Sequence, residues 1–339
     1  MKTFFYCLKA ANSVLYKIEI SLLSGKQWIR QTVKFVRCAI AYLFEQTMRY
    51  CIIHLFLLLL PYLAYCQERP TAYTLSDEYN LWGLSVSDTT YIFAENAYVR
   101  DQPNLDGTVL DSLPAGSMLI ILSPAYNGNK IKGVYAPWHQ VAYKIGNDIK
   151  KGFIWIGLLS LGKQQDAQGN VYLYGFDRFI PSDGNKADRY ICSVKLLNAK
   201  NALIGKHQFE MPYAGQSYMD AKLLPNMGLK DLRHIFRIAF SGEACGIPTD
   251  YYYAGWNGSN FFALPKRYAV SDAGIFYYEE SILFPTEHRK EANVIYKLIE
   301  HGEAVETTDA LAEITYKVSR TEEKFLWTGK GFTKLGDSK

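Results

Sequence analysis

Hydrophobic positions between residues 91 and 156 occur in short runs, several of them alternating with polar positions, and turn-forming residues separate the runs. Such runs, bounded by glycine, proline and asparagine, are typical of β-strands. The runs lie at residues 91–93, 97–100, 109–113, 117–122, 138–143 and 152–156, with turns expected at 101–107, 114–116, 127–129 and 146–148. Short strands joined by tight turns over so few residues can bury a core only by curling together, so we predict a small β-barrel.

The chain after residue 170 is again strand-like. Residues 189–197 and 202–209 flank a polar turn and are predicted to form a hairpin. Residues 234–240 alternate, which places their phenylalanines on one face of a strand. We therefore predict a larger antiparallel β domain over residues 171–339, built as a sandwich or as a propeller-like array.

Two segments of this C-terminal region share the pattern Trp-x-Gly-x-x-Phe, at residues 256–261 and 327–332. The glycine permits the positive φ of a tight hairpin turn, and the flanking aromatic rings can pack across the paired strands. The two segments are therefore predicted to form equivalent hairpins.

The composition also favours an all-β protein. The 339 residues include 26 tyrosines and 18 phenylalanines, and aromatic residues favour strands. The apolar fraction of 49% is that of a globular protein, and the length allows two ordinary domains and an N-terminal segment. We place the domains at residues 91–162 and 171–339, with a polar boundary at 162–170 and a polar spacer at 67–90.

Residues 48–66 have the three parts of a secretory signal peptide. Arg49 is basic, an apolar run follows, and Ala64 and Cys66 are small, so cleavage is expected between Cys66 and Gln67. Histidine and proline interrupt the apolar run, which is shorter than the about 20 residues that span a bilayer. A cleaved signal is therefore favoured over a permanent anchor, and the mature chain is predicted to be exported to the periplasm or the cell surface.

Residues 1–47 mix apolar residues with spaced lysine and arginine. Two explanations remain open: a start site assigned too early, with Met48 as the first residue, or a cytoplasmic leader that forms an amphipathic helix. Residues 63–66 resemble the lipid-attachment box of bacterial lipoproteins, although Tyr65 stands where that box has a small residue. The membrane is thus expected as a partner only through the signal segment or through a lipid on Cys66.

Residues 90–162 carry an ordered series of short motifs. The series consists of Tyr98-Val99-Arg100 with Pro103, Val109, Leu113-Pro114-Ala115-Gly116, Trp138 with Val141, and Gly152-Phe153-Ile154. In this order the motifs resemble the bacterial SH3-like domain of envelope proteins, with Tyr98 and Phe153 as mild departures. The resemblance implies a small non-catalytic barrel that binds cell-wall peptides or glycans, often beside another domain.

Charge argues against a nucleic-acid partner. The chain has a formal charge of +4, but its first 66 residues hold eight basic residues against two acidic ones. Removing those eight from 37 and those two from 33 leaves 29 basic and 31 acidic residues. A nearly neutral mature chain lacks the basic face that neutralises phosphate groups.

Only two of the six cysteines, Cys192 and Cys245, lie beyond the signal segment. In an oxidising compartment the two can form a disulfide. The other interpretation is that both are buried free thiols, and the sequence leaves the two interpretations equally open.

An enzyme alternative centres on Cys245, because SH3-like domains often accompany cell-wall peptidases that use a cysteine nucleophile. Cys245 lies among small residues, and His207, His234 and His288 are candidate bases. The Asp-Cys-Ser-Gly signature of those peptidases is absent, and Pro248 disfavours a helix directly after the cysteine. We therefore predict no enzyme activity and keep a cysteine-dependent cell-wall hydrolase as an alternative.

No metal site or cofactor is predicted. Histidines beyond the signal segment are never three or four positions apart, which excludes a helical ligand pair. The loop at residues 183–188 lacks the distal glutamate of a helical calcium site and is more simply a turn.

The candidate ligand-binding residues are aromatic and polar side chains of the predicted barrel. Tyr126, Trp138 and Trp155 lie in or beside its loops and strand ends, where exposed rings can stack on sugars or hold peptide side chains. Asp101 and Asn104, in the long first turn, would add polar contacts. The alternative is that the tryptophans only fill the barrel core.

The sequence thus favours a non-catalytic binding protein of the bacterial cell envelope. Its SH3-like domain would contact a cell-wall peptide, a glycan or another envelope protein. The remaining hypotheses are the hydrolase that uses Cys245 and a structural scaffold with no ligand of its own.

Mass spectrometry of the N-terminus of the native protein tests the predicted export signal. We expect the mature chain to begin at Gln67, because signal cleavage follows small residues at alternate positions. A lipid-modified Cys66 at the N-terminus would establish the lipoprotein alternative, and a retained segment before Met48 would contradict the cleaved signal.

Overall fold

The structure is a computed structural model that describes residues 32–37, 39–42, 81–242, 244–305 and 313–336. The chain divides into two compact units, Met1–Arg69 and Pro70–Lys339. In the first unit the described residues are helical and carry exposed side chains. The predicted signal segment at 48–66, with Cys66, and the predicted spacer up to residue 80 lie outside the described residues. In the described part of the chain, no helix is both long and apolar enough to cross a membrane.

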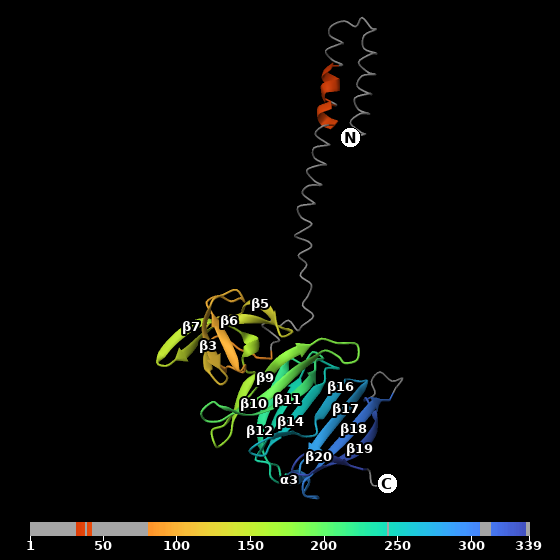
Figure 1. Cartoon of the computed structure of the whole chain (residues 1–339). Helices are drawn as coiled ribbons and strands as arrows, with labels where there is room; N and C mark the ends of the chain where they lie inside the picture. The colour runs from red at the N-terminus through yellow and green to blue at the C-terminus, as the bar shows by residue number, and fades with distance from the viewer. Residues whose placement is uncertain (1–31, 38, 43–80, 243, 306–312, 337–339) are drawn as a thin grey trace. The chain divides into compact units, whose positions relative to one another are not determined.

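The second unit is built from antiparallel β-sheets, which confirms the all-β prediction. Its first sheet has seven strands in the order β1-β4-β6-β7-β2-β3, with β5 paired to β6 (Figure 1). The strands are β1 (Thr89–Tyr91), β2 (Asn96–Arg100), β3 (Val109–Pro114), β4 (Met118–Ile121), β5 (Tyr126–Ile131), β6 (Val134–Ile145) and β7 (Asp148–Trp155). Buried and exposed side chains alternate along β2 and β4, as the sequence pattern predicts.

This first sheet does not close into the predicted barrel. Among the described strands, β1 and β3 lie at its two edges, and β2 meets β7 only through Arg100 and Phe153. Closure is unnecessary because the core continues into the next sheet. Ile92 and Trp155 belong to the same buried cluster as Tyr174, which lies in the second sheet. The second sheet thus covers the apolar face of the first sheet, which a closed barrel would bury in its own interior.

The hairpin between β5 and β6 turns at Lys132 and Gly133, so the turn predicted at residues 127–129 is wrong. Those residues lie inside β5, where the pairing with β6 shifts between Tyr126 and Gly128. Lys132 and Gly133 have φ values of 51° and 81°, and a two-residue hairpin of type I′ requires two positive values. The asparagines that suggested a turn are therefore accommodated by an irregular strand.

The turn at Lys132 and Gly133 is also where the first sheet meets the second. The Phe179 amide donates a hydrogen bond of 3.0 Å to the Lys132 carbonyl oxygen. A Cβ atom on Gly133 would lie 2.4 Å from the Phe179 carbonyl oxygen, so only glycine fits this close approach. At a second contact, Gly116 lies against the side chain of Leu197. Backbone atoms as well as side chains therefore fix how the two sheets dock.

The second sheet has four strands in the order β11-β10-β9-β8. They are β8 (Gly162–Gln165), β9 (Val171–Ile180), β10 (Arg189–Leu197) and β11 (Leu203–Pro212). The last two form the predicted hairpin. The polar stretch at residues 162–170, where a domain boundary is predicted, contains β8 and its turn into β9. Asp166 closes that turn by accepting hydrogen bonds from the amides of Gln168 and Asn170.

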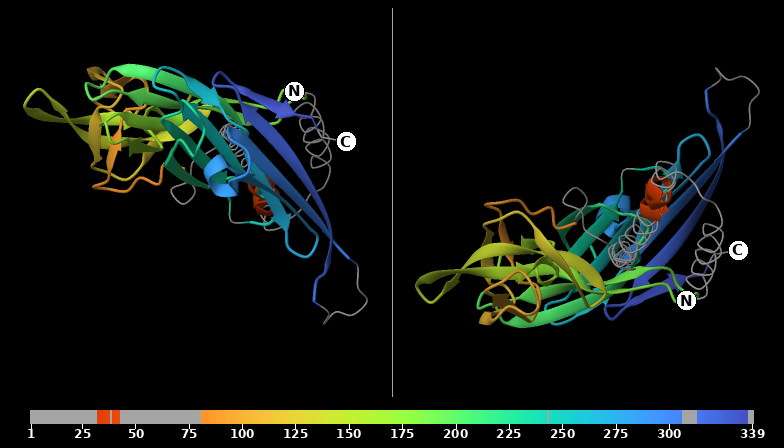
Figure 2. Two further views of the ribbon diagram at one scale, coloured as in Figure 1. Left: turned by 90° about the horizontal axis from the view of Figure 1, so that it is seen from below. Right: turned by 90° about the horizontal axis from the view of Figure 1, so that it is seen from above.

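The third sheet has nine strands in the order β12-β13-β14-β16-β17-β18-β19-β20, with β15 paired to β14. They are β12 (Tyr218–Pro225), β13 (His234–Ser241), β14 (Thr249–Trp256), β15 (Phe261–Ala263), β16 (Arg267–Asp272), β17 (Phe276–Leu283), β18 (Val294–Ala304), β19 (Tyr316–Trp327) and β20 (Phe332–Leu335). Short helical segments are η1 (Ile156–Leu158) after β7 and α3 (Pro285–His288) after β17. The long β18–β19 hairpin extends away from the other strands (Figure 2).

The second and third sheets pack against each other through aromatic side chains. The Phe236 ring of β13 lies 6.2 Å from that of Tyr172 and 5.3 Å from that of Tyr174, both in β9. The phenylalanines of β13 enter this shared core, as predicted, whereas Ile235 enters a separate cluster with Trp327. β13 is therefore buried on both faces, which explains its almost uninterrupted apolar sequence.

The two Trp-x-Gly-x-x-Phe segments form equivalent hairpins, as predicted. Trp256 pairs with Phe261 between β14 and β15, and Trp327 pairs with Phe332 between β19 and β20. The paired rings have centroids 4.8 and 5.0 Å apart, and the two glycines have φ values of 105° and 84°. The same turn chemistry thus produces the same local structure at two places in one sheet, beside the interior strand β14 and at the β20 edge.

Replacing Gly133 by alanine tests whether its close approach to Phe179 holds the first two sheets together. We expect Gly133→Ala to lower the free energy of unfolding by about 3 kcal/mol, because positive-φ strain of about 1–2 kcal/mol adds to the clash with the Phe179 carbonyl. Urea unfolding followed by tryptophan fluorescence measures the loss.

Gly146→Ala is the matched control. Gly146 also has a positive φ, 59°, in a two-residue turn between β6 and β7, but a Cβ there would meet no atom within 4 Å. The free energy of unfolding of Gly146→Ala should therefore fall only by the cost of the positive-φ strain. Equal losses in the two variants would show that the Gly133 contact adds nothing to stability.

Candidate ligand-binding site

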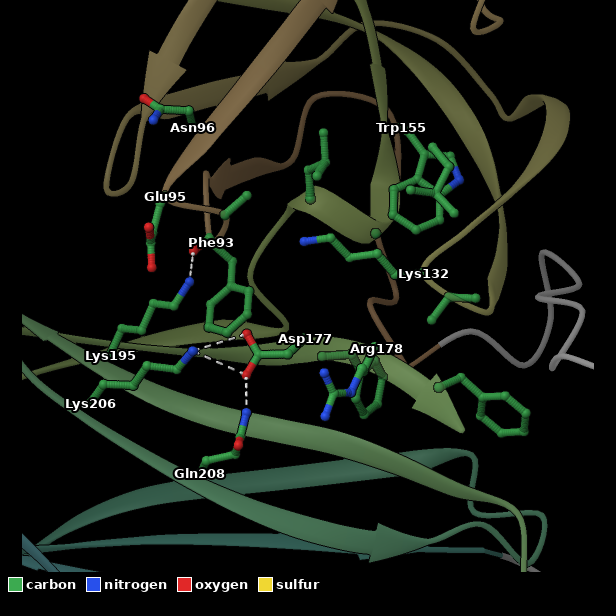
Figure 3. Close-up of a pocket in the computed structure, with 17 residues that line it drawn as sticks. Phe93, Glu95, Asn96, Lys132, Trp155, Asp177, Arg178, Lys195, Lys206 and Gln208 are labelled. Carbon is green, nitrogen blue, oxygen red and sulfur yellow. Dashed lines mark hydrogen bonds and ion pairs between the residues drawn. The ribbon is translucent and has the colours of Figure 1, made fainter. Parts of the chain in front are cut away.

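A cavity of about 640 Å³ lies between the first and second sheets (Figure 3). One wall comes from the β1–β2 connection, the β5–β6 hairpin and the end of β7, and the other from β9, β10 and β11. Segments far apart in the chain therefore meet at the line where the sheets dock. A concave site of this size can enclose a small ligand or a peptide fragment.

A β-bulge in β9 shapes the cavity wall. The pairing between β9 and β10 passes from Phe176 opposite Cys192 to Arg178 opposite Ile191, so Asp177 has no partner residue on β10. An extra residue in a strand re-aims the neighbouring side chains. Both Asp177 and Arg178 consequently line the cavity, where a regular strand would direct one of them to the opposite face.

The Asp177 carboxylate is held by two side chains of β11. Gln208 donates from Nε2 to Oδ2 at 2.9 Å, and Lys206 Nζ lies 3.3 Å from the same oxygen (Figure 3). Burial opposes ionisation of Asp177, but the Gln208 hydrogen bond and the charges of Lys206 and Lys195 outweigh it and lower the pKa below its usual 3.8. Asp177 is therefore negatively charged at neutral pH, with Lys206 as its counterion.

Lys195 is a cation on the floor of the cavity and is only 3% exposed. Its Nζ donates to the Phe93 carbonyl oxygen at 2.8 Å and lies 4.1 Å from the centre of the Phe93 ring. Burial lowers the pKa of this ammonium group, and the charge of Asp177 acts in the opposite direction. Because Lys195 belongs to the second sheet and Phe93 to the β1–β2 connection, this contact joins the two walls.

Two further cations, Lys132 and Arg178, line the cavity and are exposed. Neither makes an ion pair with a residue in the described part of the chain. They come from different walls, Lys132 from the first sheet and Arg178 from the second (Figure 3). The whole lining contains four cationic and two acidic side chains, so the electrostatic potential in the cavity favours an anionic ligand.

The second acidic side chain of the lining, Glu95, lies at another part of the rim. Glu95 and its neighbour Asn96 are exposed, and Glu95 lies on the other side of the Phe93 ring from Arg178 (Figure 3). The Glu95 carboxylate has no hydrogen bond or ion pair with any described residue. The Phe93 ring lies between Glu95 and Arg178.

Of the five residues predicted to bind ligand, Trp155 is the one that lines this cavity. It is 2% exposed, and its Nε1 donates to the Ala136 carbonyl oxygen at 2.8 Å. Trp138 is also 2% exposed and donates to Asn129 Oδ1 at 2.7 Å within the core, which agrees with the core-filling alternative. Tyr126 is 43% exposed but lies outside the cavity lining.

Asp101 and Asn104 shape the loop that contains them. Asp101 Oδ1 accepts a hydrogen bond of 2.7 Å from the Thr108 amide, and Asn104 Oδ1 accepts hydrogen bonds from the amides of Asp106 and Gly107. Neither residue lines the cavity. The structure therefore does not bring them together with Trp155, and their side-chain oxygens close the β2–β3 turn.

Cys192 and Cys245 are free thiols and are not joined in a disulfide. Cys192 is buried, and burial raises the pKa of its thiol well above the usual value. Cys245 is exposed and lines a separate groove of about 440 Å³. The described lining of that groove contains no histidine, so the nucleophile and base of a cysteine hydrolase do not meet there.

The histidines considered as bases lie elsewhere. His207 lines a small apolar pocket, His234 Nδ1 lies 4.0 Å from Asp166 Oδ2, and His288 Nε2 lies 2.8 Å from the Val294 carbonyl oxygen. Over the described ranges, no three histidine, cysteine, aspartate or glutamate side chains are placed to hold a metal ion.

The charged lining of the cavity was not predicted from the sequence. One signal was available, because Lys195 lies in the otherwise apolar second half of β10, and an isolated cation in a buried strand needs a partner. Lys132, Arg178 and Lys206 resemble ordinary surface charges in the sequence. Only the docking of the sheets gathers them around one cavity.

Scans of protein-family models, curated proteins and solved structures each find no match to the chain. The functional argument therefore starts from the geometry and charge of the cavity.

The Asp177→Asn variant tests whether the ionised carboxylate stabilises the fold. At about pH 7 we expect a loss of about 1–2 kcal/mol in the free energy of unfolding, because the bonds from Gln208 and Lys206 lose their charge assistance. The folded-state pKa is lowered, so the contribution is fully present above the usual pKa of 3.8. It is lost as the pH falls through the folded-state pKa.

Urea unfolding of the wild type and Asp177→Asn from about pH 7 down to about pH 3 measures this difference. Asp148→Asn, at an exposed position beside the β6–β7 turn, is the control and should lose little at any pH. A difference between wild type and Asp177→Asn that stays constant over this range would contradict the assigned ionisation.

Proposed function

We propose that this protein is a non-catalytic binding protein of the bacterial cell envelope, and that its cavity holds a negatively charged cell-wall peptide or glycan. The observation that carries the proposal is the excess of positive charge around the cavity, where Lys132 and Arg178 have no ion-pair partner among the described residues. The planar guanidinium group of Arg178 suits a carboxylate, to which it can donate two parallel hydrogen bonds.

Two features of the sequence support an envelope location. Residues 48–66 have the pattern of a signal peptide, and residues 90–162 resemble bacterial SH3-like domains. In this proposal the seven-stranded sheet is an SH3-like domain that is opened against the second sheet. Cell-wall peptides carry free carboxylates, so the ligand class implied by the resemblance fits the charge of the cavity.

The arrangement of the charged groups favours binding over catalysis. Asp177 is fixed by Lys206 and Gln208, and its pKa is moved away from neutrality. General acid–base catalysis works best with a group whose pKa lies near the working pH. Lys195 is likewise fixed, because its ammonium group donates to the Phe93 carbonyl oxygen. These groups are therefore fixed charges around the cavity.

Calorimetric titration of the full chain with soluble peptidoglycan fragments tests the proposal. We expect binding in the wild type and at least tenfold weaker binding in the double variant Lys132→Met/Arg178→Gln, because a hydrogen bond to a charged group contributes about 1.5–3 kcal/mol. The wild-type affinity should also fall with added salt.

The double variant Lys144→Met/Lys151→Gln is the control, because it removes the same charge from two exposed positions on β6 and β7 that do not line the cavity. Its affinity should equal that of the wild type. The proposal would be overturned by equal weakening in both double variants, or by a wild type that binds no fragment.

A further inference from the structure

We infer that the ligand of this cavity is a zwitterion, whose carboxylate is bound by Lys132 and Arg178 and whose free ammonium group is bound by Glu95. This inference rests on the proposed function and narrows its ligand class. A peptide with a free amino group and a free carboxylate has the required chemistry.

The first step of the argument is the separation of charge within one cavity. Arg178 and Glu95 lie on opposite sides of the Phe93 ring, and the Lys132 side chain extends toward the space between them (Figure 3). None of the three charged side chains has an ion-pair partner among the described residues. The cavity therefore presents unpaired charges of both signs to a ligand.

The remaining charges of the lining do not compete for this role. Lys206 forms an ion pair with Asp177, with Nζ 3.3 Å from Oδ2. The Lys195 ammonium group donates a hydrogen bond of 2.8 Å to the Phe93 carbonyl oxygen. Glu95 forms no ion pair with Lys195 in the described structure, although its negative charge acts to raise the pKa of that ammonium group. The groups that remain for a ligand are thus two cations and one carboxylate.

Electrostatic complementarity then selects the ligand. A simple anion would satisfy Lys132 and Arg178 but would leave Glu95 without an ion pair and would be repelled by it. A zwitterion pairs with all three groups. The aromatic ring of Phe93, which lies between Glu95 and Arg178 in Figure 3, suits a short apolar spacer between the two charges of the ligand.

The backbone holds Glu95 in a defined place although its side chain is exposed. The Glu95 carbonyl oxygen accepts a hydrogen bond of 3.2 Å from the Ala115 amide, and Asn96 pairs with Pro114 at the start of β2. The carboxylate therefore extends from an anchored strand end, which limits the entropy lost when a ligand binds.

Titration of the full chain with four forms of one tripeptide tests the inference. The probes are trialanine with both ends free, N-acetylated trialanine, trialanine amide, and the doubly blocked peptide. For the wild type we expect acetylation and amidation each to weaken binding about tenfold, the effect of losing one charge-assisted hydrogen bond.

The Glu95→Gln variant identifies the group that binds the ammonium. In this variant free trialanine should bind about tenfold more weakly than in the wild type, and acetylation should have no further effect. Unchanged binding of the acetylated peptide would show that the variant is folded. Glu322→Gln, at an exposed position on β19 outside the cavity, is the control and should behave as the wild type.

The outcomes separate this inference from the proposed function. If amidation weakens binding but acetylation does not, the cavity binds a carboxylate but not an ammonium group. The proposed anion site is then retained, and the inference that the ligand is a zwitterion is wrong. If acetylation weakens binding equally in the wild type and in Glu95→Gln, the ammonium is bound elsewhere and the inference is also wrong. If amidation has no effect, the proposed anion site itself fails.

Discussion

The close approach of Gly133 to the Phe179 carbonyl oxygen is the constraint on which the candidate site depends. It requires a glycine in a turn with two positive φ values, and it sets the distance between the first two sheets. At that distance Lys195 can reach the Phe93 carbonyl oxygen. The same turn carries Lys132 to the edge of the cavity. One backbone contact thus positions both a structural cation and a cation that is free to bind a ligand.

Docking also explains why the first sheet remains open. A small sheet must cover its apolar face, and it can do so by closing on itself or by packing against another sheet. Here the buried cluster runs without interruption from Ile92 through Trp155 to Tyr174 and Phe236. The core of the first sheet is therefore shared with the second and third, and the cavity is the charged part of a contact that is mostly apolar.

Local sequence patterns predicted the strands well, because alternation and turn residues act within a few positions of one another. The hairpins at Trp256 and Trp327 and the strand around Phe236 were predicted for this reason. The turn at residues 127–129 was wrong because asparagine and glycine can also occupy an irregular strand. The cavity could not be predicted, since Lys132, Arg178 and Glu95 come together only through docking between strands that are distant in sequence.

Hydrogen–deuterium exchange of the full chain, with and without soluble peptidoglycan fragments, tests most directly whether the space between the sheets is the binding site. The account predicts slower exchange on binding at three separate segments, residues 93–96, 131–134 and 176–179, which line the cavity or flank it. Slower exchange confined to the loop around Asp101 and Asn104, or to the groove at Cys245, with no change in those three segments, would contradict it.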